Sequence, residues 1–511
     1  MRRLLLDRYA RRLGGGQLLL GGEPARLVRL SSPGSDALDA LLAGPRSIED
    51  PAVSELARRL LAAGLVHPLA SPDDVGAPGS DVDPSFPRPS VTVVVPSRNP
   101  PQTLSALLGS LTPAVTGWPG SVIVVDDGSD DGGRGSAAAA SAAGAAFVRR
   151  ERSGGPAKAR NTPVTGTDLV VFLDADTVLE GPDPSEWLRR CSAHFCDERV
   201  ALVAPRIAST TGPGRAGSRW IESYEELESP LDLGPHPGLV GAHHRLSYVP
   251  AAALVARRAA LEEIGGFDEE MRYGEDVDLV RRLEEAGWLI RYEPSAVVKH
   301  HPRGSASSFA RQRFGYGTSA AALDRRHPGT VPPFVAAPGP ALAAVSLVAA
   351  SAADRRFVRA CLAAVAAATT AIGAARLSRR LAGARCPRPT RLAADLAARA
   401  TISATRGLFT ALRRVWWPFV LPGLAWRGTR RATLVACGTA AIFGHGRGAL
   451  SAAARPATPR GRIAAAAGHL ATGVSDDAAY GSGVLVGCFR EHSARALLPQ
   501  LRRKPKDPLA R

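Results

Sequence analysis

Three short apolar runs, each ending in polar side chains, constrain the fold of this chain more than any other feature. The runs occupy residues 91–95, 122–125 and 170–173. Each is rich in β-branched residues and too short for a helix, so each is predicted to be a buried strand. Helical stretches separate the runs, and this alternation predicts an α/β domain around a largely parallel sheet. Ligands of such sheets bind beyond the carboxyl ends of the strands, where the polar clusters lie.

The third run ends in two carboxylates, Asp174 and Asp176. Unpaired charge is costly to bury, so both side chains need water, a cation or a metal at the strand exit. One residue separates them, which places both on the same side of an extended chain. Two acidic oxygens suit magnesium or manganese, which keep phosphates and waters in their other positions. An acidic loop without a ligand is the alternative.

Two further clusters lie between the runs. Asp126 and Asp127 follow the second run and either bind a uracil imide or ribose hydroxyls, or form a tight Asp-Gly turn. The glycine-rich residues 153–155 precede Lys158 and Arg160, two cations that could offset phosphate charge. The phosphate-loop and dinucleotide fingerprints are both missing here, which argues against nucleotide hydrolysis and hydride transfer.

A third acidic cluster occupies residues 274–279, Gly-Glu-Asp-Val-Asp-Leu. Asp276 is predicted to open a helix. An acid in this position can be a cap or a partner of the helix dipole. It can also be a general base if it points toward a reacting hydroxyl from a rigid element.

Six motifs in fixed order carry a family resemblance. They are Val-Val-Val-Pro-Ser-Arg-Asn, Val-Asp-Asp-Gly-Ser, Gly-Gly-Pro-Ala-Lys-Ala-Arg-Asn, Asp-Ala-Asp, Gly-Gly-Phe-Asp and Gly-Glu-Asp-Val-Asp-Leu. In this order, over roughly residues 90–320, the chain resembles a family 2 inverting glycosyltransferase of GT-A fold. The resemblance implies an enzyme of the EC 2.4 class that uses a UDP-sugar donor and a divalent metal, Mg or Mn.

The resemblance also implies roles for single residues. Asp276 would be the catalytic base, with Glu275 beside it. The implied metal ligands are Asp176, Asp174 and His301. The implied nucleotide-sugar ligands are Pro96, Arg98, Asn99, Asp126, Asp127, Lys158, Arg160, Asn161, Asp174 and Arg313. Residues 311–317 fall where polymerising members carry Gln-x-x-Arg-Trp, but the spacing is broken, which argues against long-chain polymerisation.

The regions on either side of this domain are predicted separately. Residues 1–70 read as a hairpin around residues 21–22 followed by two helices, near 35–42 and 51–63. This order resembles the winged-helix, peptide-recognising domain; a small packing domain is the alternative. Residues 71–89, rich in Pro, Gly, Asp and Ser, are predicted to be a linker. We therefore divide the chain into a winged-helix-like domain (1–70), the linker, a GT-A domain (90–325) and a helical C-terminal region (326–511).

The combined layout is similar to one group within the family. The N-terminal domain, the 311–319 segment and the tail segment 476–483 carry this closer resemblance. It implies transfer of glucose from UDP-glucose, as β-1,4-linked units, onto a peptide-derived small-molecule acceptor. The alternatives are a membrane transferase with a lipid or polysaccharide acceptor, and a non-catalytic peptide-binding scaffold.

The C-terminal region contains two uncharged stretches, residues 334–353 and 360–375, in which alanine dominates. They are either membrane helices or an alanine-rich hairpin of a soluble protein. Residues 413–417, Arg-Arg-Val-Trp-Trp, suit a lipid headgroup region, where cations and amphipathic rings are both stable. We therefore expect residues 335–430 to associate with the cytoplasmic face of the cell membrane.

Charge and cysteine content narrow the choice of partners. The chain has 64 Lys and Arg against 47 Asp and Glu, a net charge of +17, which favours an anionic partner. Because no groove-reading or zinc-finger signature accompanies the charge, we expect no nucleic-acid partner. The six cysteines are scattered, and the N-terminus lacks the apolar core of a signal peptide. Both features predict reduced thiols in the cytoplasm.

Overall fold

A computed structural model of the chain describes residues 4–44, 50–69, 88–99, 103–162, 164–179, 183–210, 219–302 and 305–502. The chain forms two compact units. The sheet unit comprises Met1–Gly212 and Ser229–Pro302, and the helical unit comprises Pro213–Glu228 and Arg303–Arg511. The predicted linker lies almost entirely outside the described residues. The predicted boundary at residue 325 stays a prediction, whereas the compact units divide at Pro302.

The N-terminal part of the sheet unit contains the predicted hairpin and both predicted helices. Its elements are β1 (Leu4–Leu6), β2 (Arg11–Leu13), β3 (Leu18–Gly21), β4 (Arg26–Arg29), α1 (Ser32–Ala43), α2 (Pro51–Ala62) and β5 (Val66–Pro68). Strands β3 and β4 pair antiparallel, as the glycine turn predicted. Ser31 and Asp50 cap the two helices by accepting backbone N–H bonds. Leu19, Leu38 and Leu60 lie at the centre of this domain's own core.

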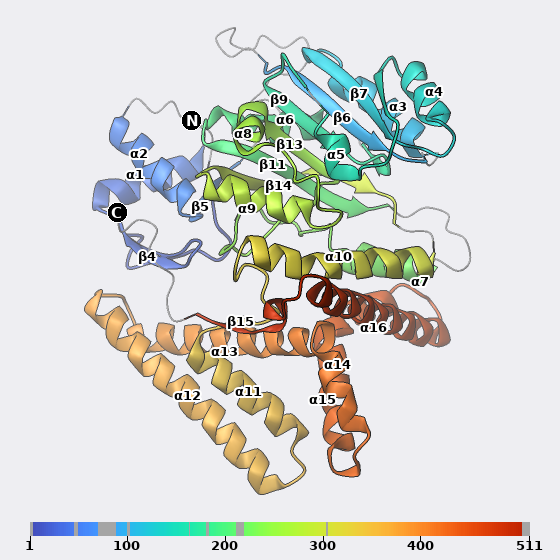
Figure 1. The fold of residues 1–511 in the computed structure, drawn as a ribbon. Helices are drawn as coiled ribbons and strands as arrows, with labels where there is room; N and C mark the ends of the chain where they lie inside the picture. Colours follow the sequence, from blue (N-terminus) through green and yellow to red (C-terminus); the bar gives the residue numbers. More distant parts are fainter. Residues whose placement is uncertain are drawn as a thin grey trace. The chain divides into compact units, whose positions relative to one another are not determined.

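A nine-stranded sheet forms the body of the sheet unit (Figure 1). Its strands are β6 (Val91–Ser97), β7 (Gly120–Asp127), β8 (Ala146–Arg150), β9 (Leu169–Leu173), β10 (Thr177–Val178), β11 (Val200–Ser209), β12 (Gly238–Val240), β13 (Ala253–Arg257) and β14 (Leu289–His300). The order is β10-β14-β11-β13-β9-β6-β7-β8, with β12 also on β14. The three predicted strands β6, β7 and β9 lie together and run parallel, as expected.

The sheet as a whole is mixed, which corrects the expectation of a largely parallel one. Strand β13 runs antiparallel to both of its neighbours, β9 and β11. An apolar run predicts burial on both faces but carries no information on strand direction, so the sequence pattern could not distinguish the two cases. The fold is therefore an α/β domain with a GT-A-like mixed sheet, followed by a largely helical C-terminal region.

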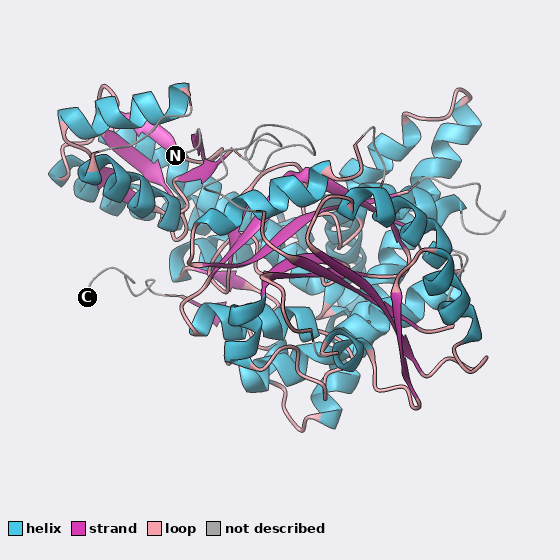
Figure 2. Cartoon of the chain, turned by 90° about the horizontal axis from the view of Figure 1, so that it is seen from above, coloured by secondary structure: helices cyan, strands magenta, loops and turns pink. Residues whose placement is uncertain are grey.

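Helices cover both faces of this sheet, which Figure 2 shows as a twisted layer of strands. One face packs against α3 (Thr103–Val115), α4 (Arg134–Ala142) and α6 (Glu186–Ser192). The other face packs against α5 (Pro156–Arg160), α8 (Arg258–Ile264) and α9 (Glu275–Glu285). Leu107 and Leu111 of α3 and Leu279 and Leu283 of α9 are fully buried at i, i+4 spacing, which explains the helical period of both segments.

The helical unit is largely helical, as predicted, and most of its helices are long. They are α7 (Arg219–Glu228), α10 (Ala306–Arg326), α11 (Pro338–Ala352), α12 (Arg356–Gly383), α13 (Pro389–Arg414), α14 (Trp417–Val420), α15 (Arg427–Ala453) and α16 (Pro459–Arg490). Helices α10 and α16 approach closely because glycines line their contact. A Cβ atom at Gly317 would overlap the Tyr480 carbonyl oxygen, and one at Gly483 would overlap that of Phe314. Among the described residues, α12 is the helix whose length and composition would allow it to cross a membrane.

Candidate active site

Arg160 joins two acidic motifs that lie 100 residues apart in the sequence. It ends helix α5 and donates from Nη2 to Asp174 Oδ1 at 2.7 Å and from Nη1 to Glu275 Oε1 at 2.9 Å. The guanidinium is buried, which disfavours its charge, but the two carboxylates outweigh burial and raise the pKa of Arg160. The predicted phosphate ligand is therefore engaged with protein carboxylates, and it brings the Asp174 and Glu275 motifs together.

Asp276 lies at the start of α9, at the same edge of the sheet. Its carboxylate accepts the Val277 N–H at 2.8 Å and the Ala251 N–H at 3.4 Å. The neighbouring residue, Ala252, accepts the Asp174 N–H at 2.9 Å, so one backbone segment contacts both acids. Burial, and next the charge of Glu275, raise the pKa of Asp276 to about 7. A carboxylate with a pKa near neutrality is suited to general-base catalysis at physiological pH.

Asp176 is the half-buried acid beyond strand β9. His300 Nε2 lies 3.3 Å from Asp176 Oδ1, and the His301 N–H donates to the Asp176 carbonyl at 3.0 Å. The His301 ring instead lies 3.0 Å from Thr210 Oγ1. The ring beside the Asp176 carboxylate is thus that of His300 and not that of the predicted His301. Successive side chains point to opposite faces of a strand, and a His-His pair does not reveal which one faces the acid.

These acids fit a metal that is shared with a substrate. Within the part of the chain that the structure describes, no three His, Cys, Asp or Glu side chains form a complete metal-binding group. Asp174 and Asp176 offer carboxylate oxygens, and Asp174 shares one of them with Arg160. Magnesium and manganese are commonly held by one or two carboxylates, with phosphates and waters as the other ligands.

Asp127 organises the glycine-rich loop. Its carboxylate accepts hydrogen bonds from Arg150 Nε at 3.0 Å, Ser153 Oγ at 2.8 Å, Gly154 N at 2.9 Å and Gly155 N at 2.8 Å. Although burial acts in the opposite direction, these bonds lower the pKa of Asp127. Asp127 therefore holds the glycine-rich loop in place through its carboxylate. Its nucleotide-binding role stays a prediction.

Asp126 and the loop after β6 also have other protein groups as hydrogen-bond partners. Asp126 is fully buried and accepts hydrogen bonds from Ser129 Oγ at 2.5 Å and Ser136 Oγ at 2.8 Å. Asn99 adopts a left-handed backbone, φ 49°, and exchanges two 2.9 Å hydrogen bonds with Asp130. Pro96, near the end of β6, is half-buried, and Arg98 and Asn99 in the loop are exposed. The nucleotide-binding role of this loop stays a prediction.

Asn161 contacts the Gly-Gly-Phe-Asp motif, and Lys158 contacts Glu269, the residue after it. The Asn161 amide accepts the Phe267 N–H at 2.9 Å and donates to the Phe267 carbonyl at 2.7 Å. Lys158 is half-buried, with Nζ 3.9 Å from Glu269 Oε2. Asn161 therefore fixes a loop in the structure, whereas Lys158 is only loosely paired, and its phosphate-binding role stays a prediction.

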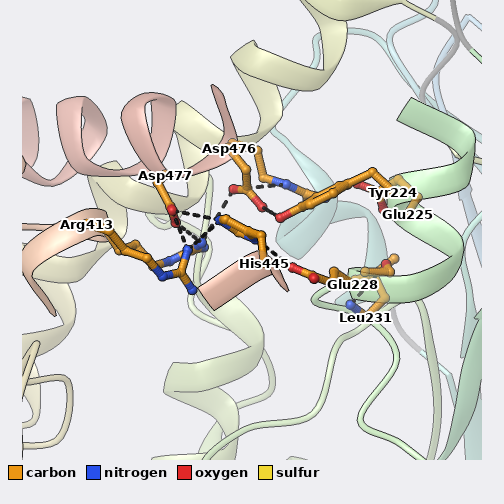
Figure 3. A network of polar contacts seen from close by, with 11 residues as sticks. Tyr224, Glu225, Glu228, Leu231, Arg413, His445, Asp476 and Asp477 are labelled. Carbon is orange, nitrogen blue, oxygen red and sulfur yellow. Dashed lines mark hydrogen bonds and ion pairs between the residues drawn. The ribbon is translucent and has the colours of Figure 1, made fainter. Parts of the chain in front are cut away.

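The last predicted ligand, Arg313, lies in the helical unit. It forms an ion pair with Glu225 of α7, and its Nε lies 3.4 Å from Asp476 Oδ1 of α16. Tyr224 Oη donates to the other Asp476 oxygen at 3.0 Å (Figure 3). The Arg313 guanidinium is buried and surrounded by these acids, so within the helical unit it joins α7, α10 and α16.

The same network continues through two buried histidines. His445 of α15 lies 2.7 Å from Glu228 Oε2 and 3.0 Å from Asp477 Oδ2, and His469 lies 3.0 Å from Glu228 Oε1. Burial alone would raise the pKa of Glu228, but the hydrogen bonds from both histidines lower it to about 2. Sequence reasoning missed these residues because more than 200 positions separate Glu228 from its partners.

The arginine and tryptophan segment expected at a lipid headgroup region belongs to this interior instead. Arg413 forms an ion pair with Asp477, and Arg414 lies 3.3 Å from the same carboxylate. Trp416 Nε1 donates to the Leu497 carbonyl at 2.8 Å. Both arginines and the Trp416 indole therefore have their polar partners within the helical unit. Residues 413–417 therefore give no support to membrane association.

A GT-A-like mixed sheet with acidic residues collected beyond its strands defines a transferase domain of the glycosyltransferase class. Residues 87–315 match the family model described as "Glycosyltransferase like family 2". The chain is 37% identical over 504 residues to the pre-mycofactocin glycosyltransferase of Mycobacterium tuberculosis, covering 97% of both chains. The chain belongs to glycosyltransferase family 2, and it is an enzyme.

Two other comparisons are more distant. Over 102 residues, the chain is 36% identical to an N-acetylglucosaminyl-diphospho-decaprenol L-rhamnosyltransferase of Mycobacterium tuberculosis. The match covers 20% of this chain and 30% of that protein. A mannosyltransferase of Pyrobaculum calidifontis, solved with GDP-Man and Mn²⁺, is 19% identical with a TM-score of 0.35, covering 64% of this chain and 90% of that one. A TM-score this low supports no inference on ligands.

Proposed function

We propose that this enzyme transfers a hexose from a UDP-sugar to pre-mycofactocin, with inversion at the sugar carbon. The acceptor is suggested by the relative that is similar along 97% of the chain, including the N-terminal domain and the helical unit. The observation that carries the chemistry is the placement of Asp276 beside the Asp174 motif through the Ala251-Ala252 segment. Glucose as the sugar and a β-1,4 linkage rest on the family resemblance of the sequence.

In the proposed reaction, Asp276 takes the proton of the acceptor hydroxyl. The hydroxyl oxygen then forms a bond to the anomeric carbon of the sugar while the bond from that carbon to the diphosphate breaks. The Ala251 and Val277 N–H groups orient the Asp276 carboxylate. Arg160 holds Glu275 next to it and partly offsets the second negative charge. A positioned base of this kind contributes about 10²–10⁴-fold to the rate.

Asp176 and Asp174 would hold a magnesium or manganese ion together with the donor diphosphate. When bound, such an ion neutralises negative charge that develops on the departing diphosphate. Arg160 donates to one oxygen of Asp174 at 2.7 Å and so fixes the orientation of this carboxylate. Lys158, whose contact with Glu269 is long at 3.9 Å, is proposed to contact the donor phosphates.

The N-terminal domain is proposed to contribute to acceptor recognition. Arg245 of the sheet unit reaches into this domain, with Nη2 2.7 Å from Asp7 Oδ2 and Nε 2.6 Å from Glu23 Oε1. The guanidinium also lies 4.0 Å from the centre of the Tyr9 ring. Six residues after Arg245, the same chain segment contacts Asp276 through Ala251. The N-terminal domain is thereby connected to the segment that orients the proposed base.

Removal of the metal tests one part of this proposal. Full-length protein treated with EDTA should lose transfer from UDP-glucose to pre-mycofactocin, and added Mn²⁺ or Mg²⁺ should restore it. Product formation is measured by mass spectrometry. Unchanged turnover in EDTA would contradict the metal role of Asp174 and Asp176 while leaving the proposed base untouched.

A lipid-linked acceptor is the second candidate, favoured by the 102-residue similarity to a decaprenol-directed rhamnosyltransferase. The two candidates are separated by supplying pre-mycofactocin and a polyprenyl-diphosphate sugar in one reaction. We expect the hexose on pre-mycofactocin. Its appearance on the lipid would favour the second candidate.

A further inference from the structure

The helical unit exposes large apolar side chains on α11, α12 and α15. Phe357 on α12 is 79% exposed, Ile442 on α15 is 65% exposed and Leu342 on α11 is 50% exposed. Only 6% of the most apolar 18-residue window of α12 is buried within the protein. Helix α11 packs against both α12 and α15, and exposed apolar side chains gathered on neighbouring helices mark a surface that is covered by another phase or another molecule.

Exposed arginines collect at one end of these helices. Arg355, Arg356 and Arg359 lie at the turn between α11 and α12, and Arg427, Arg430 and Arg431 lie at the start of α15. These six residues are called the arginine tip. Arg431 Nη1 lies 3.3 Å from Asp354 Oδ1, so the two groups meet. In Figure 1, the α11–α12 hairpin and α15 extend in the same direction from the level of α13.

The apolar segments above the arginine tip have similar lengths. Residues 360–375 of α12 separate Arg359 from Arg376, and residues 432–446 of α15 separate Arg431 from Arg447, with no Asp, Glu, Lys or Arg in either segment. At 1.5 Å per residue each segment spans about 22–24 Å. The hydrocarbon core of a bilayer is about 30 Å thick, so neither uncharged segment spans it alone, although the whole of α12 is long enough. A crossing would also carry six arginines through the core, at a high free-energy cost.

We propose that α11, α12, α15 and the arginine tip bind the surface of an anionic lipid bilayer, with the helices lying in the interface. The apolar side chains would enter the acyl boundary, and the arginines would contact lipid phosphates. Trp426 and Phe419, 64% and 61% exposed, are aromatic residues near the tip that suit the headgroup level. This inference is independent of the acceptor and of the metal.

Vesicle binding by the full-length protein tests the charge contribution. We expect binding to vesicles of phosphatidylcholine mixed with phosphatidylglycerol, little binding to phosphatidylcholine alone, and release by salt. The double variant Arg355→Gln/Arg356→Gln should weaken binding about 30-fold. The matched control, Arg58→Gln/Arg59→Gln on α2, removes the same charge from exposed positions and should leave binding unchanged.

The apolar contribution is tested with Phe357→Ser, which should weaken vesicle binding at low salt while transfer of sugar in solution stays unchanged. Equal binding to neutral and anionic vesicles, or equal effects of the tip and α2 variants, would overturn the proposal. So would a self-associated species, detected by sedimentation, that Phe357→Ser dissociates and that binds no vesicles. That result would assign the apolar surface to a second copy of the chain.

Discussion

At the scale of single residues, the acids of the candidate active site have different kinds of partner. Arg160 forms ion pairs with both Asp174 and Glu275, whereas the Asp276 carboxylate accepts hydrogen bonds from backbone N–H groups. A buried carboxylate without a cation of its own retains its proton to a higher pH than one with an ion pair. The arrangement therefore gives Asp174 a cationic partner and leaves Asp276 able to exchange a proton near neutral pH.

Removal of the proposed base is the first prediction. Asp276→Asn keeps the size of the side chain but cannot accept the hydroxyl proton, so kcat should fall about 10²–10⁴-fold with a small change in donor KM. Steady-state kinetics with the UDP-sugar measures both constants. Glu270→Gln, an exposed position shortly before α9, is the control and should behave like the parent enzyme. A kcat within about threefold of the parent would exclude Asp276 as the base.

The pH dependence is the second prediction. A general base works only when it is ionised, and the pKa of Asp276 is raised to about 7 by burial and by Glu275. The rate should therefore rise with pH through about 7 and level off above it. A profile of kcat/KM against pH measures this limb. A flat profile between pH 5 and 8 would contradict the proposed base, because a carboxylate with an ordinary pKa is ionised throughout that range.

The sequence could predict which motifs lie at the strand ends, but not which residues their side chains contact. Short apolar runs are a local signal, so the sequence correctly placed Asp126, Asp127 and Asp174 at the ends of strands. The bonds of Asp127 to Ser153, Gly154 and Gly155 and the choice of His300 over His301 depend on how side chains orient in three dimensions. A one-dimensional pattern carries no such information.

At the scale of elements, glycines bring α10 and α16 close together in the helical unit. This contact joins two sequence motifs, residues 311–319 and 476–483, through Gly317 and Gly483. Small residues allow the two backbones to approach, and the ion pairs of Arg313 and Asp476 then form at the same contact. The role of both motifs in the described structure is the packing of two helices that lie far apart in sequence.

Substitution of these glycines is the third prediction. In Gly483→Ala the new methyl group would overlap the Phe314 carbonyl oxygen, so the backbones must separate. The expected loss of unfolding free energy is about 1–3 kcal/mol, as for overpacked cores. Chemical denaturation of the full-length protein measures it. Gly438→Ala, at a helical glycine with open space around its Cβ position, is the control and should be neutral or stabilising.

The direction of β13 shows what the sequence leaves open at this scale. Residues 253–257 lie in an apolar segment like the three predicted strands, and their burial on both faces is the same in either direction. The connection through α7 in the helical unit, which interrupts the chain between β11 and β12, also has no local signal. Both features are set by long-range pairing.

At the scale of the whole molecule, the buried network of Figure 3 makes the stability of the chain depend on pH, which is the fourth prediction. The lowered pKa of Glu228, about 2, adds stability that is complete above its ordinary value of 4.5 and is lost as pH falls toward 2. Burial would lower the pKa of His445, but its hydrogen bonds to Asp477 and Glu228 raise it above 6.5. The His445 contribution is complete below pH 6.5 and is lost as pH rises through the raised pKa.

Thermal unfolding at a series of pH values tests this dependence. The difference in Tm between the parent protein and His445→Gln should be largest between about pH 4.5 and 6.5 and should shrink as pH rises further. His492→Gln, at an exposed position, serves as the control, and its difference from the parent should not vary with pH in this way. A constant His445→Gln difference across the range would show that His445 does not gain a proton in the folded protein.

The whole molecule combines a family 2 transferase domain, an N-terminal domain attached through Arg245, and a helical unit with an exposed apolar surface. The order of local motifs was enough to predict the family and its fold. The division into two compact units, and the location of the exposed apolar surface, depend on which helix faces are covered by others. That information appears only when the helices are packed.

The central claim is that Asp276 activates an acceptor hydroxyl of pre-mycofactocin for attack on a UDP-sugar. The most direct measurement is mass spectrometry of pre-mycofactocin incubated with UDP-glucose, a divalent metal and either the parent enzyme or Asp276→Asn. The account predicts addition of hexose by the parent enzyme and its near-complete loss with the variant, while the variant keeps its fold and its affinity for UDP. Equal addition of hexose by both proteins, or none by the parent enzyme, would contradict it.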